Sequence, residues 1–339
     1  MSTLDTAAAA GVTGHYRKTV FIITPTIFLS AFLLFWFEPM VGKMMLPLLG
    51  GAAAVWITCL LFFQLMLLAG YGYAYVLERY ANVRTQIVVH AIMLAAVLFF
   101  LPIHFGARPD EAASAHPSAW LLWQLIKTAG FPFCIVSTTA PLLQNWFSKT
   151  PAVSGRDPYF LYAVSNAGSL IALLTYPLIV EPAVGVRNQS WWWGAGFVVL
   201  GLLVATVSII VWKTASDESR VFDDVTADVP VWRTRVFWLA AAFVPSALML
   251  AVTNHILLNL ASVPFLWILP LAVYLITFMI AFGRRIHLSI ELVSALVAVT
   301  LLLLFPFAAT NRAVEAKYLL FIVAVPVLLA AIGFWPWRK

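Results

Sequence analysis

Long apolar runs separated by short polar stretches recur along almost the whole chain. A bilayer core about 30 Å thick requires about 20 apolar residues of helix, and a helix satisfies its own backbone hydrogen bonds in lipid. The fourth run is long enough to tilt, or to kink at Pro132 or Pro141. The pattern predicts an all-α, polytopic transmembrane helix bundle of about ten spans, at 19–37, 54–77, 86–106, 118–147, 158–180, 190–212, 236–256, 263–283, 288–307 and 318–335.

The composition agrees with a chain that lies mostly in lipid. Of the 339 residues, 63% are hydrophobic and 10% are charged, whereas an ordinary soluble domain has roughly 25% charged residues. The short alternating strands of a transmembrane barrel are not found in the pattern. The sequence therefore predicts an integral membrane protein, in the cytoplasmic (inner) membrane.

The distribution of basic residues predicts the orientation of the spans. If the N-terminus is inside, most Lys and Arg residues fall in the cytoplasmic segments. One misplaced span would move every later loop to the wrong side and weaken this bias. The bias therefore favours N-in/C-in topology, and it explains the net charge of +6 by topology and anionic lipid rather than by nucleic acid. The cytoplasmic segments then hold 14 of the 20 Lys and Arg residues, namely Arg17, Lys18, Arg79, Arg84, Lys149, Arg156, Lys213, Arg220, Arg233, Arg235, Arg284, Arg285, Arg338 and Lys339.

The longest polar stretch, KTASDESRVFDDVTADVPVWRTR at 213–235, divides the spans into two blocks. It is too short for a soluble domain, and its acidic run is typical of a solvated face. Residues 1–18 are interpreted as a cytoplasmic tail, because the apolar run behind them is too long for a signal peptide and lacks a cleavage site. The predicted organisation is this tail, a six-span block at 19–212, a cytoplasmic acidic linker at 213–235, and a four-span block at 236–339 with a short cytoplasmic C-terminus.

Polar residues in the spans are costly in lipid and are therefore candidates for a site. Glu38 lies in WFEPMVGKMMLPLLG at 36–50, directly before Pro39 and Gly42. The proline and the glycine would end or kink the first span and place freed carbonyls beside the carboxyl group. This arrangement predicts a cation or proton site in the outer half of the bundle. The alternative is a structural ion pair of Glu38 with Lys43 or Lys127.

The other candidates are distributed over several spans. Lys127 lies nine residues into the fourth span, and Asn166 lies mid-span among small residues, where an interhelical hydrogen bond is the alternative use. Asn254 and His255 lie at the outer end of the seventh span. A histidine there is either an interface residue or, facing Glu38, a proton relay. The candidate substrate-binding residues are Glu38, Lys43, Lys127, Asn166, Asn254 and His255.

The tryptophan triplet Trp191, Trp192 and Trp193 begins the sixth span on the outer side. Tryptophan is enriched at membrane interfaces, so the triplet predicts an interface anchor. A platform on which a ligand stacks is the alternative.

Motifs typical of soluble enzymes and of metal sites are missing from the sequence. No pair of Cys or His residues has metal-ligand spacing. The sequence contains no GxxxxGK[ST], GxSxG or HExxH, and no GxGxxG after a strand. We therefore expect no bound metal, no cofactor and no catalytic residues in this chain.

Several stretches together resemble one known family. In chain order they are FEPMVGKMMLPLLGGAAAVWITCLLFFQLMLLAGYGYAY (37–75), STTAPLLQNWFSKT (137–150), RDPYFLYAVSNAGSLIALLTYPLIVEP (156–182), the QSWWW start of the sixth span, and ASVPFLWILPLAVYLITFMIAF (261–282). They are similar to the membrane half of proteins described as fused major-facilitator/spermidine synthases. The resemblance implies a transporter-like membrane region.

In that family the membrane half precedes a soluble domain that resembles spermidine synthase. That domain has a Rossmann-like fold, a Gly-rich loop for decarboxylated S-adenosylmethionine and acidic residues for the amine. This chain stops at FWPWRK with neither feature, so the family's catalytic residues have no matching positions here. The resemblance thus leads us to expect a protein that is not an enzyme.

Three functions are consistent with these observations. The first is a transporter-like protein that handles a small cationic or polyamine-like solute. The second is a membrane anchor or scaffold for a separately encoded, soluble spermidine synthase-like or methyltransferase partner. The third is a membrane-embedded enzyme with Glu38 and His255 as acid and base. The expected partners are the lipid bilayer, a small solute and the soluble synthase-like protein.

Overall fold

The chain divides into two compact units, Met1–Asp223 (unit 1) and Asp224–Lys339 (unit 2). The boundary falls within the acidic stretch at 213–235. A computed structural model of the protein describes residues 3–106, 116–150, 160–214, 231–259, 268, 271–276 and 278–279. Every regular element in these ranges is helical.

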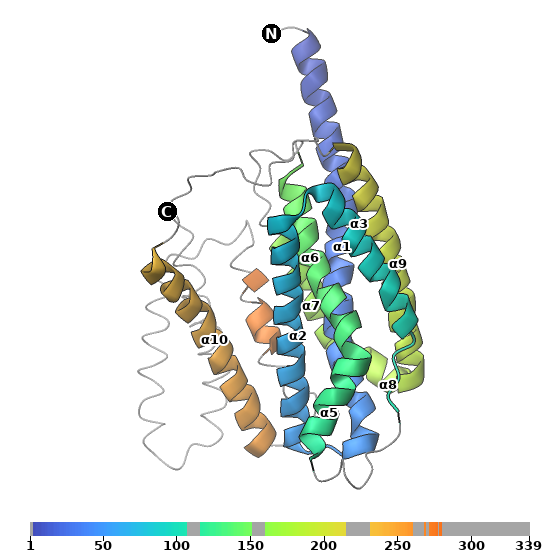
Figure 1. The fold of residues 1–339 in the computed structure, drawn as a ribbon, viewed down its shortest axis with the longest axis vertical. Helices are drawn as coiled ribbons and strands as arrows, with labels where there is room; N and C mark the ends of the chain where they lie inside the picture. The colour runs from blue at the N-terminus through green and yellow to red at the C-terminus, as the bar shows by residue number, and fades with distance from the viewer. Residues whose placement is uncertain are drawn as a thin grey trace. The chain divides into compact units, whose positions relative to one another are not determined.

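Unit 1 is a bundle of long helices that run along one common direction (Figure 1). The N-terminus extends from one end of this bundle. Its elements are α1 (Thr3–Leu49), α2 (Ala53–Tyr80), α3 (Val83–Val97) with the 3₁₀ turn η1 (Leu98–Phe100), α5 (Pro117–Leu125), the π-helical η2 (Ile126–Gly130), α6 (Phe131–Ser148), α7 (Phe160–Thr175), the π-helical η4 (Tyr176–Val180), α8 (Glu181–Ala183) and α9 (Val186–Thr214). In unit 2 the structure describes α10 (Trp232–Asn259).

Six stretches of the described residues are helices long and apolar enough to cross a membrane. They are Thr19–Leu49, Ala54–Tyr80, Val83–Phe100, Pro117–Ser148, Phe160–Ala183 and Val186–Lys213. These six correspond to the first six predicted runs. Helix α10 covers the seventh run. The eighth run, at 263–283, is described only in part, and the runs at 288–307 and 318–335 lie outside the described residues.

Helix α1 does not end where the sequence pattern predicted. It begins at Thr3, within the predicted tail, and contains Pro25, Pro39 and Pro47 before it ends at Leu49. A proline removes one backbone hydrogen bond, but packed neighbours allow a membrane helix to continue through it. The helix stops before Gly50, whose φ of 78° is a conformation that glycine adopts without steric cost.

The predicted irregularity of the fourth span takes the form of a π-helical turn. Residues Ile126–Gly130 adopt this wider geometry and end two positions before Pro132. Proline has no backbone N–H to donate to the carbonyl four residues earlier, so the regular hydrogen-bond ladder cannot continue through it. Pro141 lies inside the regular helix α6.

The core of unit 1 is built around α1, which packs against α2, α6, α7 and α9. The Phe37 ring on α1 is fully buried. Its centroid lies 6.3 Å from that of Phe63 on α2, 5.8 Å from that of Phe133 on α6 and 4.8 Å from that of Trp193 on α9. One aromatic side chain therefore joins four helices.

Small residues allow two pairs of helices to approach closely. At Gly70 on α2, a Cβ atom would overlap the hydroxyl of Ser137 on α6, and the Thr138 hydroxyl donates to the Gly70 carbonyl at 3.0 Å. At Gly168 on α7, a Cβ would overlap the backbone carbonyl of Phe28 on α1. Such contacts between backbones are a main source of helix association in membranes.

Buried polar side chains connect α3 to α6. The Trp146 indole donates to the Gln86 side-chain oxygen at 2.8 Å, and the Gln86 amide donates to the Ala81 carbonyl at 2.9 Å. His90 Nε2 lies 3.2 Å from the Thr139 hydroxyl, which itself donates to the Ile135 carbonyl. Since a hydroxyl has one hydrogen to donate, His90 Nε2 is the donor in this pair.

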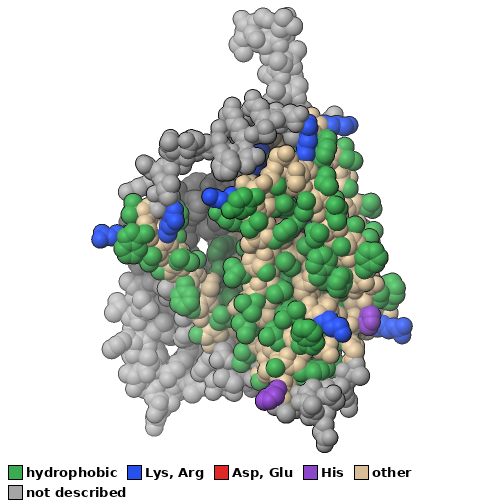
Figure 2. Space-filling model, viewed as in Figure 1, with side chains coloured by type: hydrophobic (Ala, Val, Ile, Leu, Met, Phe, Trp, Pro, Cys, Tyr) green, Lys and Arg blue, Asp and Glu red, His purple; other side chains and the backbone are tan. Residues whose placement is uncertain are grey.

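The surface of unit 1 is largely apolar. Figure 2 shows hydrophobic side chains over the viewed face of the bundle, with basic side chains toward its ends. Leu68 on α2 is 69% exposed and Phe99 in η1 is 91% exposed. An apolar surface of this extent is suited to contact with lipid rather than with water.

Candidate functional site

Glu38 lies on α1 within the first candidate span and is half-buried. Its side chain forms no hydrogen bond or ion pair with any described residue. The predicted alternative, an ion pair with Lys43, is wrong, because the Lys43 ammonium lies 2.7 Å from a carboxylate oxygen of Glu181 at the start of α8. Since α1 continues through Pro39, the step of five positions from Glu38 to Lys43 turns the lysine roughly 140° around the helix axis.

Lys127 does not pair with Glu38 either. It lies in the π-helical segment η2, its side chain is exposed, and it forms no ion pair with a described residue. The Lys127 side chain therefore lies at the surface of unit 1, without an acidic partner among the described residues.

Asn166 is half-buried on α7, and its amide nitrogen donates to the Tyr162 carbonyl at 2.8 Å. This bond lies within the helix, whereas the sequence had suggested an interhelical one. Asn254 and His255 lie on α10 in unit 2, and their side chains are outside the described part of the structure. Among the described candidates, Glu38, Lys43, Lys127 and Asn166, no hydrogen bond or ion pair joins one side chain to another.

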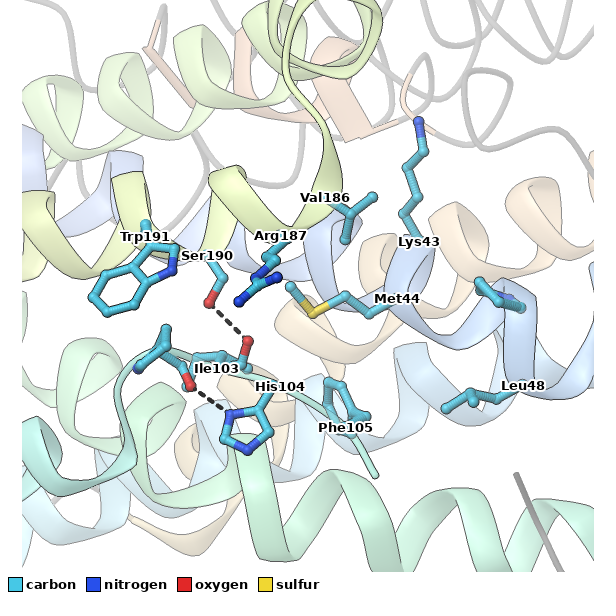
Figure 3. Close-up of a pocket in the computed structure, with 12 residues that line it drawn as sticks. Lys43, Met44, Leu48, Ile103, His104, Phe105, Val186, Arg187, Ser190 and Trp191 are labelled. Carbon is cyan, nitrogen blue, oxygen red and sulfur yellow. Dashed lines mark hydrogen bonds between the residues drawn. The ribbon is translucent and has the colours of Figure 1, made fainter. Parts of the chain in front are cut away.

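A pocket of about 550 Å³ opens at one end of unit 1, opposite the N-terminus. It is formed by the last turns of α1, the segment after η1 and the first turns of α9 (Figure 3). The lining residues are Lys43, Met44, Pro47, Leu48, Pro102, Ile103, His104, Phe105, Val186, Arg187, Ser190 and Trp191.

Two hydrogen bonds hold the wall of this pocket. The Ser190 hydroxyl on α9 donates to the Ile103 carbonyl at 2.7 Å, and His104 Nδ1 lies 2.9 Å from the Pro102 carbonyl. A carbonyl only accepts, so Nδ1 carries the hydrogen and Nε2 remains for another partner. The segment after η1 is therefore fixed against the start of α9.

The basic side chains of the pocket differ in their direction. In Figure 3 the Arg187 guanidinium extends toward the segment that contains Ile103 and His104, whereas the Lys43 ammonium points away from it. Lys43 is neutralised by Glu181, but Arg187 is exposed and has no partner among the described residues. Among the described residues, Arg187 therefore adds a positive charge to this pocket that no carboxylate neutralises.

Sequence reasoning did not single out Arg187 or His104. A signal for Arg187 was available, because it is one of the six basic residues that the predicted topology leaves outside the cytoplasmic segments. A basic residue on the side that generally has few of them is a candidate for a specific role. His104 has no comparable signal in the sequence.

The tryptophan triplet has two environments. Trp191 and Trp192 are 58% and 55% exposed, as an interface anchor would be, and Trp191 also lines the pocket. Trp193 is fully buried, and its indole donates to the Leu33 carbonyl of α1 at 2.9 Å. The prediction that all three are interfacial is therefore wrong for Trp193, because consecutive residues of a helix point in directions about 100° apart.

Unit 1 has the architecture of a polytopic α-helical membrane protein, with six candidate spans and an apolar outer surface. Among the described residues, no three His, Cys, Asp or Glu side chains lie close enough together to hold a metal ion. The chain matches no protein-family model and no curated protein.

Proposed function

We propose that this multi-pass membrane protein moves a small cationic solute, with the Glu38 carboxyl group as its binding residue. The observation that carries the proposal is that Glu38 lies within a candidate span and forms no ion pair or hydrogen bond with a described residue. An ionisable group in a membrane span is costly unless it has a partner or a function. The two lysines that would have given Glu38 a structural role do not pair with it.

The solute class follows from the charge of Glu38 and from the sequence resemblance. A carboxylate in a low-dielectric setting favours a cation. The stretch at 37–75, which contains Glu38, resembles the membrane half of fused major-facilitator/spermidine synthases, so a polyamine is the first solute to test. Asn166 on α7 remains a further candidate for contacts with this solute.

The proposed topology is ten spans with both termini in the cytoplasm of the inner membrane. In unit 1 this places the start of α1, the α2–α3 connection and the ends of α6 and α9 inside. Basic residues at these positions support the orientation, and they are Arg17, Lys18, Arg79, Arg84, Lys149 and Lys213.

Replacement of Glu38 by glutamine should abolish solute uptake. Glutamine has almost the same shape but carries no charge, so uptake of labelled spermidine or putrescine into proteoliposomes should fall about tenfold or more. Glu78→Gln is the matched control, because Glu78 is also a half-buried carboxyl group on a span of unit 1 but lies near Lys149 and Asn145. Its uptake should remain at the level of the unchanged protein.

Two results would overturn the proposal. One is the lack of polyamine uptake by the unchanged protein across a pH or potential gradient. The other is equal uptake by the Glu38→Gln variant at equal protein content in the vesicles. Size-exclusion chromatography of each variant before reconstitution separates loss of transport from loss of folding.

A further inference from the structure

We propose that the pocket between α1, the segment after η1 and α9 binds the headgroup phosphate of an anionic lipid, with Arg187 as the phosphate-binding residue. This site is separate from Glu38, which does not line the pocket. The proposal therefore does not depend on transport of a cation by the protein.

The charge of the pocket selects an anion. Its described lining residues include Lys43, His104 and Arg187 but no aspartate or glutamate. Glu181 neutralises Lys43 at 2.7 Å, so within the described residues Arg187 carries the one lining charge of an arginine or lysine that no carboxylate compensates. The planar guanidinium group of arginine matches a phosphate with two parallel hydrogen bonds.

The rest of the lining selects an amphiphile rather than a small free anion. Eight of the twelve lining residues are apolar, namely Met44, Pro47, Leu48, Pro102, Ile103, Phe105, Val186 and Trp191. A pocket with this lining would leave most of the surface of an inorganic anion without hydrogen-bond partners. The glycerol and the first acyl carbons of a lipid, in contrast, would remain in apolar contact.

The position of the pocket along the spans agrees with lipid headgroup depth. The α1 span ends at Leu49 and the α9 span begins at Val186, and both ends contribute to the lining. The exposed rings of Trp191 and Trp192 lie on the first turns of α9. Exposed tryptophans at the end of a span mark the interface, where lipid phosphates lie. Arg187 is therefore placed to meet a phosphate from the bilayer.

Hydrogen bonds within the protein hold the walls of the pocket. Ser190 fixes Ile103 to α9 at 2.7 Å, and the His104 ring is held on the Pro102 carbonyl at 2.9 Å. A binding site whose walls are already ordered loses little entropy when the ligand enters. We therefore expect a bound lipid to survive extraction of the protein in mild detergent.

Native mass spectrometry of the purified full chain tests the proposal. The probes are dioctanoyl phosphatidylglycerol, dioctanoyl phosphatidylcholine and inorganic phosphate, each added at the same series of concentrations. We expect one phosphatidylglycerol molecule to be retained at the lowest concentrations. Arg187→Gln should weaken this binding about tenfold or more, since a hydrogen-bonded charge is lost.

Lys213→Gln is the matched control, because Lys213 is an exposed basic residue at the opposite end of α9 and does not line the pocket. A second variant, Val186→Trp, fills the pocket and keeps Arg187, and it should also lose the lipid. Arg187→Gln, Lys213→Gln and Val186→Trp are each compared with the unchanged protein by thermal unfolding, so that a misfolded variant is recognised. Arg187→Lys replaces Arg187→Gln if the latter does not fold, and it should bind less tightly because lysine lacks the paired donors.

Three outcomes would overturn the proposal. The first is phosphatidylglycerol binding by Arg187→Gln that equals that of the unchanged protein. The second is an equal loss in Lys213→Gln, which would indicate a general effect of net charge. The third is binding of inorganic phosphate as tight as that of the lipid, which would indicate a site for a small anion.

Discussion

Gly168→Ala is expected to prevent stable packing of α7 against α1. The added Cβ would overlap the backbone oxygen of Phe28 and would lie 3.2 Å and 3.3 Å from the carbonyl carbon and the Cα of that residue. These atoms belong to the backbone of α1 and cannot turn aside as a side chain would. Overpacking of this kind costs about 3 kcal/mol of the free energy of unfolding, or more, because two helices must separate.

Gly201→Ala on α9 is the control for this prediction. A Cβ at Gly201 would meet no atom within 4 Å. Alanine also has the higher helix propensity, so this variant should be as stable as the unchanged protein or more stable by about 0.5–1 kcal/mol. The measurement is the midpoint of thermal or SDS-induced unfolding in detergent. Equal midpoints for the two alanine variants would show that α1 and α7 are not in close backbone contact.

Trp193→Ala is expected to destabilise unit 1 by about 3–5 kcal/mol of unfolding free energy. The Trp193 ring is fully buried, lies 4.8 Å from the Phe37 ring and 5.7 Å from the Phe197 ring between centroids, and donates to the Leu33 carbonyl. Alanine would leave a cavity at the point where α1, α2, α6 and α9 meet. The same unfolding measurement gives the loss.

Trp192→Ala is the matched control, since Trp192 precedes Trp193 directly and is 55% exposed. It should shift the unfolding midpoint only slightly. Trp193→Phe keeps an aromatic ring but removes the N–H group, so it separates ring packing from the hydrogen bond to Leu33. A larger loss for Trp192→Ala than for Trp193→Ala would contradict the buried position of Trp193.

Hydropathy predicted the six spans of unit 1 because their lengths depend only on local composition and on the thickness of the bilayer. The same signal could not show which side of a span faces protein. Trp193 illustrates the difference, because its neighbours Trp191 and Trp192 have the same chemistry but point to other sides of α9. Burial depends on neighbouring helices, which the sequence pattern does not reveal.

The predicted end of the first span beside Glu38 is wrong, and with it the predicted ion pair of Glu38 with Lys43. A break at Pro39 would have allowed Lys43 to fold back toward the carboxyl group. Helix α1 instead continues to Leu49. Lys43 forms its ion pair with Glu181, which is 138 residues later in the chain. A pair so far apart in the sequence depends on how the helices pack, and no local motif predicts it.

The pocket was not predictable for a similar reason. Its walls come from 43–48, 102–105 and 186–191, three segments separated by long stretches of other spans. Each segment by itself resembles an ordinary span end with one basic or aromatic residue. The packing of the bundle brings them together, so the sequence indicated the interface position of Trp191 but not the cavity beside it.

The central position of α1 has a consequence for the synthesis of the protein. Helix α1 leaves the ribosome before the other described helices, and some of its partners are synthesised much later. The Ser30 hydroxyl donates to the Val136 carbonyl, 106 residues further along the chain, and the Leu33 carbonyl accepts from Trp193, 160 residues further along. Until α9 has been inserted, the side of α1 that packs against α9 remains against lipid or the insertion machinery. Helix α1 thus waits for a partner that is synthesised five spans later, and a stall in translation before α9 would leave this side of α1 exposed to membrane proteases.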